Sequence, residues 1–210
     1  MKKFFIIVSI LTVVLLIGLG FFLVSMGNYG PKFEDVKNLA APRIIAKPDI
    51  KAIVVEAIGD PNKTVGPAFG LLFKTFYKMK DKPKGHAMES PRARWPKPLT
   101  TPKNEWVGYY AMPVPSTNTI LPDVKSKSGL RVELRDWQYG EVAEILHVGP
   151  YSKEVPTVEK LRQFIAQNGY EICGDHEEEY LKGPGFLATN PEKYLTIIRY
   201  QVRKTVKEAK

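Results

Sequence analysis

A strand, a proline-containing turn and a helix occur twice in the chain, and this repeat constrains the fold more than any other feature. Residues 50–58 predict a β-branched strand and residues 66–77 a helix. Residues 141–148 predict a second strand and residues 154–168 a second helix. A shift of 89 positions aligns the two copies at five places: Pro61 with Pro150, Pro67 with Pro156, Phe69 with Val158, Leu72 with Leu161 and Phe76 with Ile165.

Each helix is followed by further extended segments. These segments cover residues 106–114 after the first helix and residues 170–173, 178–181 and 194–202 after the second, and residues 130–137 alternate just before the second copy. Each copy is thus a strand-helix-strand-strand unit that cannot bury its own helix and sheet completely. We expect an α+β domain built as a pseudo-symmetric duplication, with a concave seam between the units where a small molecule can bind.

The positive charge is concentrated between the two copies. Residues 71–104 hold nine cations and two acids, a net charge of +7, whereas residues 131–200 hold eight cations and twelve acids, a net charge of −4. Five prolines in this basic stretch permit only short, edge-type strands. We expect Arg92, Arg94 and the nearby lysines to form a solvated flank. Nucleic acid is not an expected partner, because Trp95 is the one aromatic residue among these cations that could stack on bases.

The composition limits the kinds of core, cross-link and metal site that the chain can form. With 210 residues, 44% of them apolar, the chain can bury one ordinary core. Its single cysteine, Cys173, excludes an intramolecular disulfide, and its apolar strand predicts a small buried side chain. The three histidines, His86, His147 and His176, share no metal-ligand spacing. We therefore expect no metal and no other cofactor, and a core or cleft-wall role for His147, which alternates with apolar residues.

The first residues predict a membrane anchor. Residues 4–26 contain no charge, and as a helix they would span about 34 Å, enough to cross a bilayer core. A cleaved signal peptide has a shorter apolar region, of about 15 residues at most. We expect an anchor with a short N-terminal tail at 1–27, a linker at 28–46, a domain at 47–204 and a basic tail at 205–210. The two N-terminal lysines favour a single-pass protein of the cell membrane with its domain outside the cytoplasm.

The second half resembles the GyrI-like small-molecule-binding domains, which also serve as effector domains of AraC-type and multidrug-responsive regulators. The resemblance covers residues 47–204, with specific motifs in 130–202. It rests on the strand 143–148 with its Gly149-Pro150-Tyr151 turn, on Asn168-Gly169-Tyr170, on Gly174 with Glu178-Glu179-Tyr180-Leu181, on Pro184 and on the closing strand 195–202. The regulators attach a helix-turn-helix to this domain, whereas we expect none ahead of it in this chain.

The resemblance implies that Glu178 and Tyr180 place a carboxylate and a phenol in a central cleft that binds lipophilic or cationic small molecules. We expect the cleft to include aromatic and histidine side chains as well: Trp106, Tyr110, Trp137 and His147. A buried carboxylate selects a cation because its desolvation is costly without one. The family pattern has prolines and an apolar residue where this chain has Asp175, His176 and Glu177, so a solvated acidic face is the competing interpretation.

Three further interpretations keep the same fold. Some GyrI-like proteins resemble hydrolases that open reactive small rings, and Glu178 as base and Tyr180 as acid would suit that chemistry. The domain could instead be an interaction platform for a protein partner, or, by a distant likeness to the SOUL fold, a haem carrier. We favour a binding protein over an enzyme.

Overall fold

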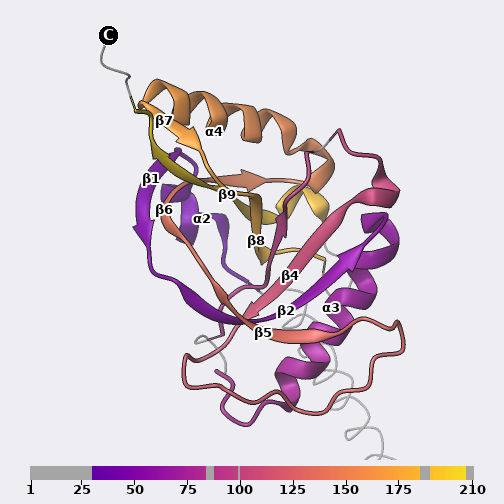
Figure 1. Cartoon of the computed structure of the whole chain (residues 1–210). Helices are drawn as coiled ribbons and strands as arrows, with labels where there is room; N and C mark the ends of the chain where they lie inside the picture. Colours follow the sequence, from indigo (N-terminus) through magenta and orange to yellow (C-terminus); the bar gives the residue numbers. More distant parts are fainter. Residues whose placement is uncertain (1–29, 84–87, 99, 185–189, 207–210) are drawn as a thin grey trace, which may run out of the picture.

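One antiparallel sheet organises the computed structural model, which describes residues 30–83, 88–98, 100–184 and 190–206 (Figure 1). Helix α3 spans Pro61–Lys78 and helix α4 spans Val155–Gln167, with a short helix α2 at Phe33–Val36. Single 3₁₀ turns lie at Lys37–Leu39, Lys103–Glu105, Tyr151–Lys153 and Pro191–Lys193. The strands are β1 Arg43–Lys47, β2 Ile50–Ile58, β3 Arg92–Trp95, β4 Val107–Pro113, β5 Val132–Trp137, β6 Gly140–Val148, β7 Tyr170–Ile172, β8 His176–Lys182 and β9 Leu195–Lys204. The expected α+β class is confirmed.

The strand order repeats from the middle of the sheet outwards. Eight strands follow the order β1-β6-β9-β8-β3-β4-β2-β5, and β7 pairs with the end of β9. Next to β3 lies β4, the last strand of the first unit, followed by β2, the first strand of that unit. Next to β8 lies β9, the last strand of the second unit, followed by β6, the first strand of that unit. The two units of the sequence repeat therefore join through β3 and β8, which places the seam between them at this pair.

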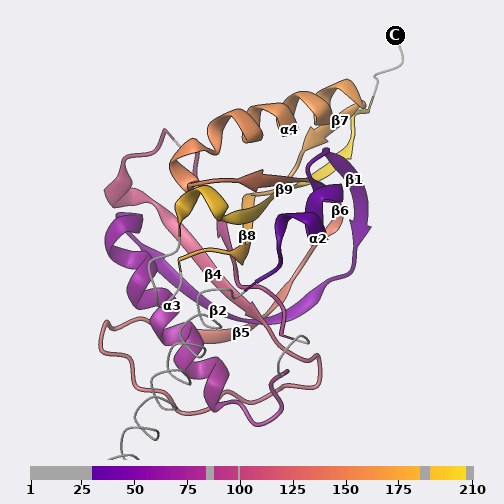
Figure 2. The ribbon, with the colours of Figure 1, turned by 180° about the vertical axis from the view of Figure 1, so that it is seen from behind.

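Both long helices cover the same face of the sheet. Cross-strand partners share a face, and the register pairs Tyr110 with Ala93, Ala93 with Glu178 and Glu178 with Ile198. Helix α3 packs against the Tyr110 and Ala93 end of this row, and helix α4 packs against the Ile198 end. Figure 2 shows α4 over β9 and α3 over β2 and β4. We call this the helix face and the other side the opposite face.

Two boundaries differ from the sequence expectations. Helix α3 begins at Pro61 rather than residue 66, because the Asp60 side chain accepts a hydrogen bond from the Asn62 N–H at 3.0 Å and caps the first turn. Part of the expected linker also belongs to the domain, since β1 pairs with β6 from Arg43 to Lys47. The other predicted strands and helix α4 agree with the structure to within two residues at each end.

Strand β3 overturns two expectations about the basic stretch. It is short, as the prolines at positions 91 and 96 require, but it pairs with β4 on one side and β8 on the other, so it is central rather than an edge. Its arginines do not form a solvated flank. The side chain of Arg92 is 2% exposed and that of Arg94 is largely buried, because both face acids of β8.

Several expectations concern residues that the structure does not describe. The segment 4–26, His86 and most of the 205–210 tail lie outside the described residues. Among the helices of the described residues, none combines the length and apolar character that a membrane span needs.

Cys173 is exposed rather than buried, because it follows β7 at the periphery of the sheet, where its backbone N–H bonds to the Gln201 carbonyl.

Candidate functional site

The acidic run on β8 is divided between the two faces of the sheet. Successive side chains of a strand point in opposite directions, so His176, Glu178 and Tyr180 lie on the helix face while Glu177 and Glu179 lie on the opposite face. Glu177 is 2% exposed and Glu178 is 8% exposed. The interpretation of this run as a solvated acidic face is therefore wrong for these two residues, and each carboxylate must be stabilised inside the protein.

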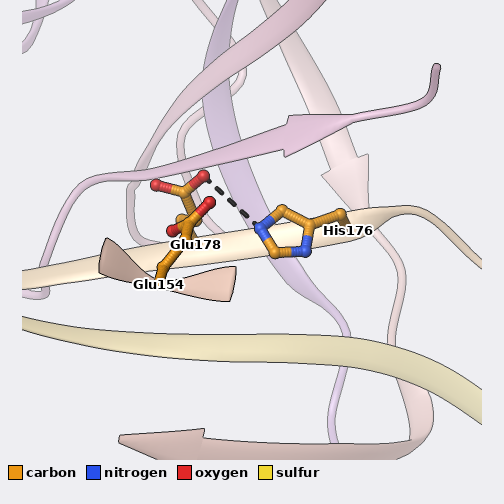
Figure 3. A group of neighbouring side chains, drawn as sticks. All are labelled: Glu154, His176 and Glu178. Atoms are coloured by element: carbon orange, nitrogen blue, oxygen red, sulfur yellow. Dashed lines mark ion pairs between the residues drawn. The ribbon is translucent and has the colours of Figure 1, made fainter. Parts of the chain in front are cut away.

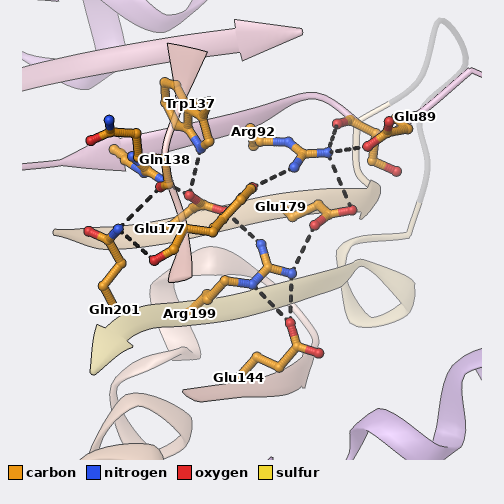
Figure 4. Close-up of polar contacts among 12 residues, drawn as sticks. Glu89, Arg92, Trp137, Gln138, Glu144, Glu177, Glu179, Arg199 and Gln201 are labelled. Carbon is orange, nitrogen blue, oxygen red and sulfur yellow. Dashed lines mark hydrogen bonds and ion pairs between the residues drawn. The ribbon is translucent and has the colours of Figure 1, made fainter. Parts of the chain in front are cut away.

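The acids of the opposite face are neutralised by arginines, as Figure 4 shows. The guanidinium of Arg199 lies 2.5 Å from Glu177 Oε1, 2.7 Å from Glu144 Oε2 and 3.0 Å from Glu179 Oε2. Arg94 adds a contact of 2.7 Å to Glu177. Burial alone would raise the pKa of Glu177, but Arg199 and Arg94 outweigh it and hold the pKa below its ordinary value.

The acids of the helix face have a different environment. Glu178 lies beside His176 and Glu154, and the donor atoms of the three side chains are within 4.8 Å of one another (Figure 3). His176 Nε2 is 3.4 Å from Glu178 Oε1. In the described part of the chain, no lysine or arginine forms an ion pair with Glu154 or Glu178. This group therefore carries two carboxylates and one imidazole without a basic partner.

Glu154 enters the group from the start of helix α4. It occupies the N-cap position, yet its side chain does not cap the helix, and its Oε2 is buried without a hydrogen-bond partner among the described residues. Burial, together with the charge of Glu178, raises the pKa of Glu154 to about 8. At neutral pH Glu154 is thus mostly protonated beside Glu178.

A chain of aromatic rings runs along the helix face past these acids. Seven rings are in successive contact, with centroids 5.2 to 5.8 Å apart, in the order Trp106, Trp95, Tyr110, Phe69, Tyr180, Tyr151 and Tyr194. The chain crosses the seam where Phe69 of α3 meets Tyr180 of β8. Burial raises the pKa of Tyr110 to about 12, and burial with the nearby Glu178 raises the pKa of Tyr180 well above 10. These phenols stay neutral at physiological pH.

The structure brings together four of the six side chains proposed from the sequence: Glu178, Tyr180, Tyr110 and Trp106 lie in this acid and aromatic group. Trp137 does not join them, because its position in β5 directs it to the opposite face, where Nε1 donates to Glu177 Oε2 at 2.8 Å. His147 shares the helix face, but its ring nitrogens lie 3.0 Å from Thr157 Oγ1 and 3.2 Å from the Pro150 carbonyl. That environment fits the core role expected for His147.

Two polar members of the group were missed in the sequence. His176 was detectable, because it precedes Glu178 and Tyr180 at the spacing of two residues that a strand requires. Glu154 was not detectable, since it belongs to another element and its approach to Glu178 depends on the tertiary packing. The group as a whole offers two carboxylates and a histidine to a cation, flanked by neutral rings that stabilise positive charge through cation–π contact.

Comparison with known proteins places this geometry in a family. Residues 40–203 match the GyrI-like small molecule binding domain. An uncharacterized conserved protein from Listeria innocua is 25% identical, with a TM-score of 0.66 over 82% of this chain and 99% of that chain. A hydrolase from Listeria innocua is 24% identical, with a TM-score of 0.62 over 81% of this chain and 98% of that chain.

The fold also occurs in a protein of lower sequence identity. The C-terminal domain of EcmrR has a TM-score of 0.53 at 15% identity, over 79% of this chain and 98% of that domain. Comparison with curated proteins finds no match. Because the family match covers most of the chain, the protein belongs to the GyrI-like small-molecule-binding domain family.

Proposed function

We propose that the chain binds small organic cations with aromatic or alkyl surface, at the seam between its two units. The observation that carries this proposal is the contrast between neighbouring acids: Glu177 has arginine partners, whereas Glu178, 8% exposed, has none among the described residues. A buried carboxylate without a counter-charge costs several kcal/mol. A bound cation offsets that cost, and a neutral ligand does not.

The rings beside Glu178 support the same ligand class. The rings of Tyr180 and Tyr151 are in edge contact with their centroids 5.6 Å apart, and the ring centroids of Phe69 and Tyr180 are 5.8 Å apart. Each ring face available to a cation contributes about 0.5 to 2 kcal/mol. Since these phenols remain protonated, they stabilise the cation through their rings and add no negative charge. The site thus favours a diffuse, weakly hydrated cation over a small, strongly hydrated one.

A matched pair of ligands tests this proposal. Phenyltrimethylammonium and tert-butylbenzene have nearly the same shape and differ in charge. In metal-free buffer we expect the full chain to bind the cation at least about tenfold more tightly, a difference of about 1.4 kcal/mol. Glu178→Gln should remove this preference, and Glu171→Gln, at an exposed acid of β7, should retain it. Equal affinities for both ligands in the unsubstituted chain would refute the proposal.

A second candidate function is hydrolysis, and the pairing of two carboxyl groups favours it. The structural neighbour from Listeria innocua at 24% identity is described as a hydrolase. In this chain Glu178 could accept a proton from water as the hydroxyl adds to an electrophilic carbon. Glu154 could donate a proton to the leaving atom as its bond to that carbon breaks. Glu154 suits the acid role better than Tyr180, because the pKa of Tyr180 is raised well above 10.

Turnover of a strained electrophile separates the enzyme from the binding protein. We suggest phenyloxirane, whose hydrolysis to the diol is measured by chromatography. An enzyme should lose turnover in both Glu178→Gln and Glu154→Gln, while Glu171→Gln stays active. The absence of turnover above the uncatalysed rate, together with retained binding of phenyltrimethylammonium, would leave binding as the function.

Membrane anchoring through residues 4–26 also remains part of this proposal. Its support is the uncharged length of that segment. Extraction of cell membranes with alkaline carbonate should leave the full chain in the membrane pellet and release a variant that lacks residues 1–27. Fusion of the C terminus to a reporter active only in the cytoplasm should give no activity if the domain lies outside, and strong activity would contradict that orientation.

A further inference from the structure

We propose that Glu154, His176 and Glu178 bind a single zinc ion at the seam. This inference goes beyond organic-cation binding, because it requires the imidazole of His176 and the carboxylate of Glu154, which a bulky organic cation does not need. The three side chains come from different places, namely the start of α4 and two positions of β8 on the helix face (Figure 3). Their donor atoms lie within 4.8 Å of one another.

The spacing of the donor atoms agrees with zinc. Zinc binds histidine nitrogen and carboxylate oxygen at about 2.0 to 2.2 Å in tetrahedral geometry, which places two ligand atoms about 3.4 Å apart. His176 Nε2 and Glu178 Oε1 are 3.4 Å apart. The Glu154 donor atom lies within 4.8 Å of the other two, so a small side-chain movement would complete the set. Three protein ligands leave the fourth position open for water or a ligand group.

The histidine is oriented as a metal ligand usually is. His176 Nδ1 lies 2.8 Å from the hydroxyl of Tyr200, whose ring also contacts the imidazole at a centroid distance of 5.2 Å. A proton on Nδ1 that is donated to the Tyr200 oxygen leaves a lone pair on Nε2. Metal-ligating histidines almost always bond through their second nitrogen in this way. Tyr200 thus acts as a positioning residue for His176.

The atoms aimed at the proposed ion lack other partners. His176 is 7% exposed, and its Nε2 has no hydrogen-bond partner among the described residues; the same holds for Glu154 Oε2. A divalent ion between Nε2 and the Glu178 carboxylate would accept a lone pair from each of them. Binding of the ion releases the proton of Glu154, and the charge of the ion then balances the two carboxylates. The mixed nitrogen and oxygen donors favour zinc over magnesium or calcium, which prefer oxygen ligands alone.

Metal titration of the full chain tests this inference. The protein is freed of metal with EDTA, dialysed and titrated with Zn²⁺ in competition with a chromophoric chelator. We expect one zinc per chain, and at least tenfold weaker binding for Glu154→Gln and for His176→Gln, because even the loss of an outer-shell partner costs about tenfold or more. Glu133→Gln, at an exposed acid of β5, should bind zinc as the unsubstituted chain does.

Cobalt supplies a second readout. Co²⁺ in a tetrahedral site of this kind should give visible ligand-field bands, and Glu154→Gln, checked for folding by circular dichroism, should lose them. Zinc affinity that is unchanged in both ligand variants, or a stoichiometry well below one, overturns the inference. The outcome is independent of organic-cation binding, because phenyltrimethylammonium is measured in metal-free buffer. If the unsubstituted chain binds zinc but not phenyltrimethylammonium, the proposed function alone is refuted. If it binds phenyltrimethylammonium but not zinc, the zinc site alone is refuted.

Discussion

Glu177 and Glu178 are consecutive residues of β8 whose side chains point to opposite faces of the sheet. Glu177 Oε1 lies 2.5 Å from Arg199 Nη1, and its Oε2 accepts hydrogen bonds from Arg94 and Trp137. Glu178 has His176 as its neighbour at 3.4 Å. One carboxylate therefore closes a network of ion pairs within the fold, and the other has no lysine or arginine partner among the described residues.

The first prediction compares the two acids by stability. Glu177→Gln leaves Arg199 and Arg94 buried with an incomplete set of partners, so it should lower the free energy of unfolding by about 3 to 5 kcal/mol. Glu178→Gln removes a buried charge that has no lysine or arginine partner among the described residues, so it should change stability by less than about 1 kcal/mol or increase it. Urea unfolding at pH 7 measures both. A larger loss in Glu178→Gln than in Glu177→Gln would contradict this division.

A second prediction concerns acid conditions. Burial alone would raise the pKa of Glu144, but Arg199 and Arg43 outweigh it and lower the pKa below 4.5. The folded state then binds the proton less readily than the unfolded chain, so this contribution is present above pH 4.5 and is lost as the pH falls below it. The free energy of unfolding should fall less steeply below pH 4.5 in Glu144→Gln than in the unsubstituted chain. Identical slopes would show that Glu144 is not stabilised by its arginines.

The opposite sign applies to Glu154 in metal-free protein. Its raised pKa of about 8, against 4.5 in the unfolded chain, means that the folded state keeps a proton that the unfolded chain releases. Stability should therefore decrease by about 1.4 kcal/mol per pH unit between these values and level off above pH 8. Chemical unfolding from pH 5 to pH 9 measures this slope. Glu154→Gln should flatten it, and the same slope in the variant would assign the effect to another group.

The fourth prediction tests the separation of the two faces. Trp137→Phe removes the hydrogen bond that Nε1 donates to Glu177 Oε2, which should cost about 1 to 3 kcal/mol because the acceptor is charged and buried. The affinity for phenyltrimethylammonium should not change, since Trp137 and Glu178 lie on different sides of the sheet. Thermal unfolding and binding titration of the same sample provide both values. A variant of normal stability with weakened ligand binding would place Trp137 in the ligand site.

Local pattern predicted most of the fold. The apolar and β-branched residues of 50–58 predicted the limits of β2, and the apolar spacing of 154–168 located α4 to within one residue at each end. These signals depend on neighbours in sequence. Strand β3 carried no such signal, because its position in the centre of the sheet comes from pairing with β8, which lies more than 80 residues later in the chain.

The candidate site was predictable only in part, for the same reason. Glu178 and Tyr180 were found because a resemblance to a known family carried them. The burial of Arg92 and Arg94 could not be inferred from charge counts, since their partners Glu179 and Glu177 lie on another strand. The position of Trp137 depends on strand register, which decides the face of every side chain.

The most direct measurement is a crystal structure of the protein with phenyltrimethylammonium bound. The account predicts the quaternary nitrogen on the helix face, beside the carboxylate of Glu178 and within about 6 Å of the ring centroid of Tyr180 or Tyr151. A ligand seated on the opposite face, among Trp137, Glu177 and Arg199, would contradict it.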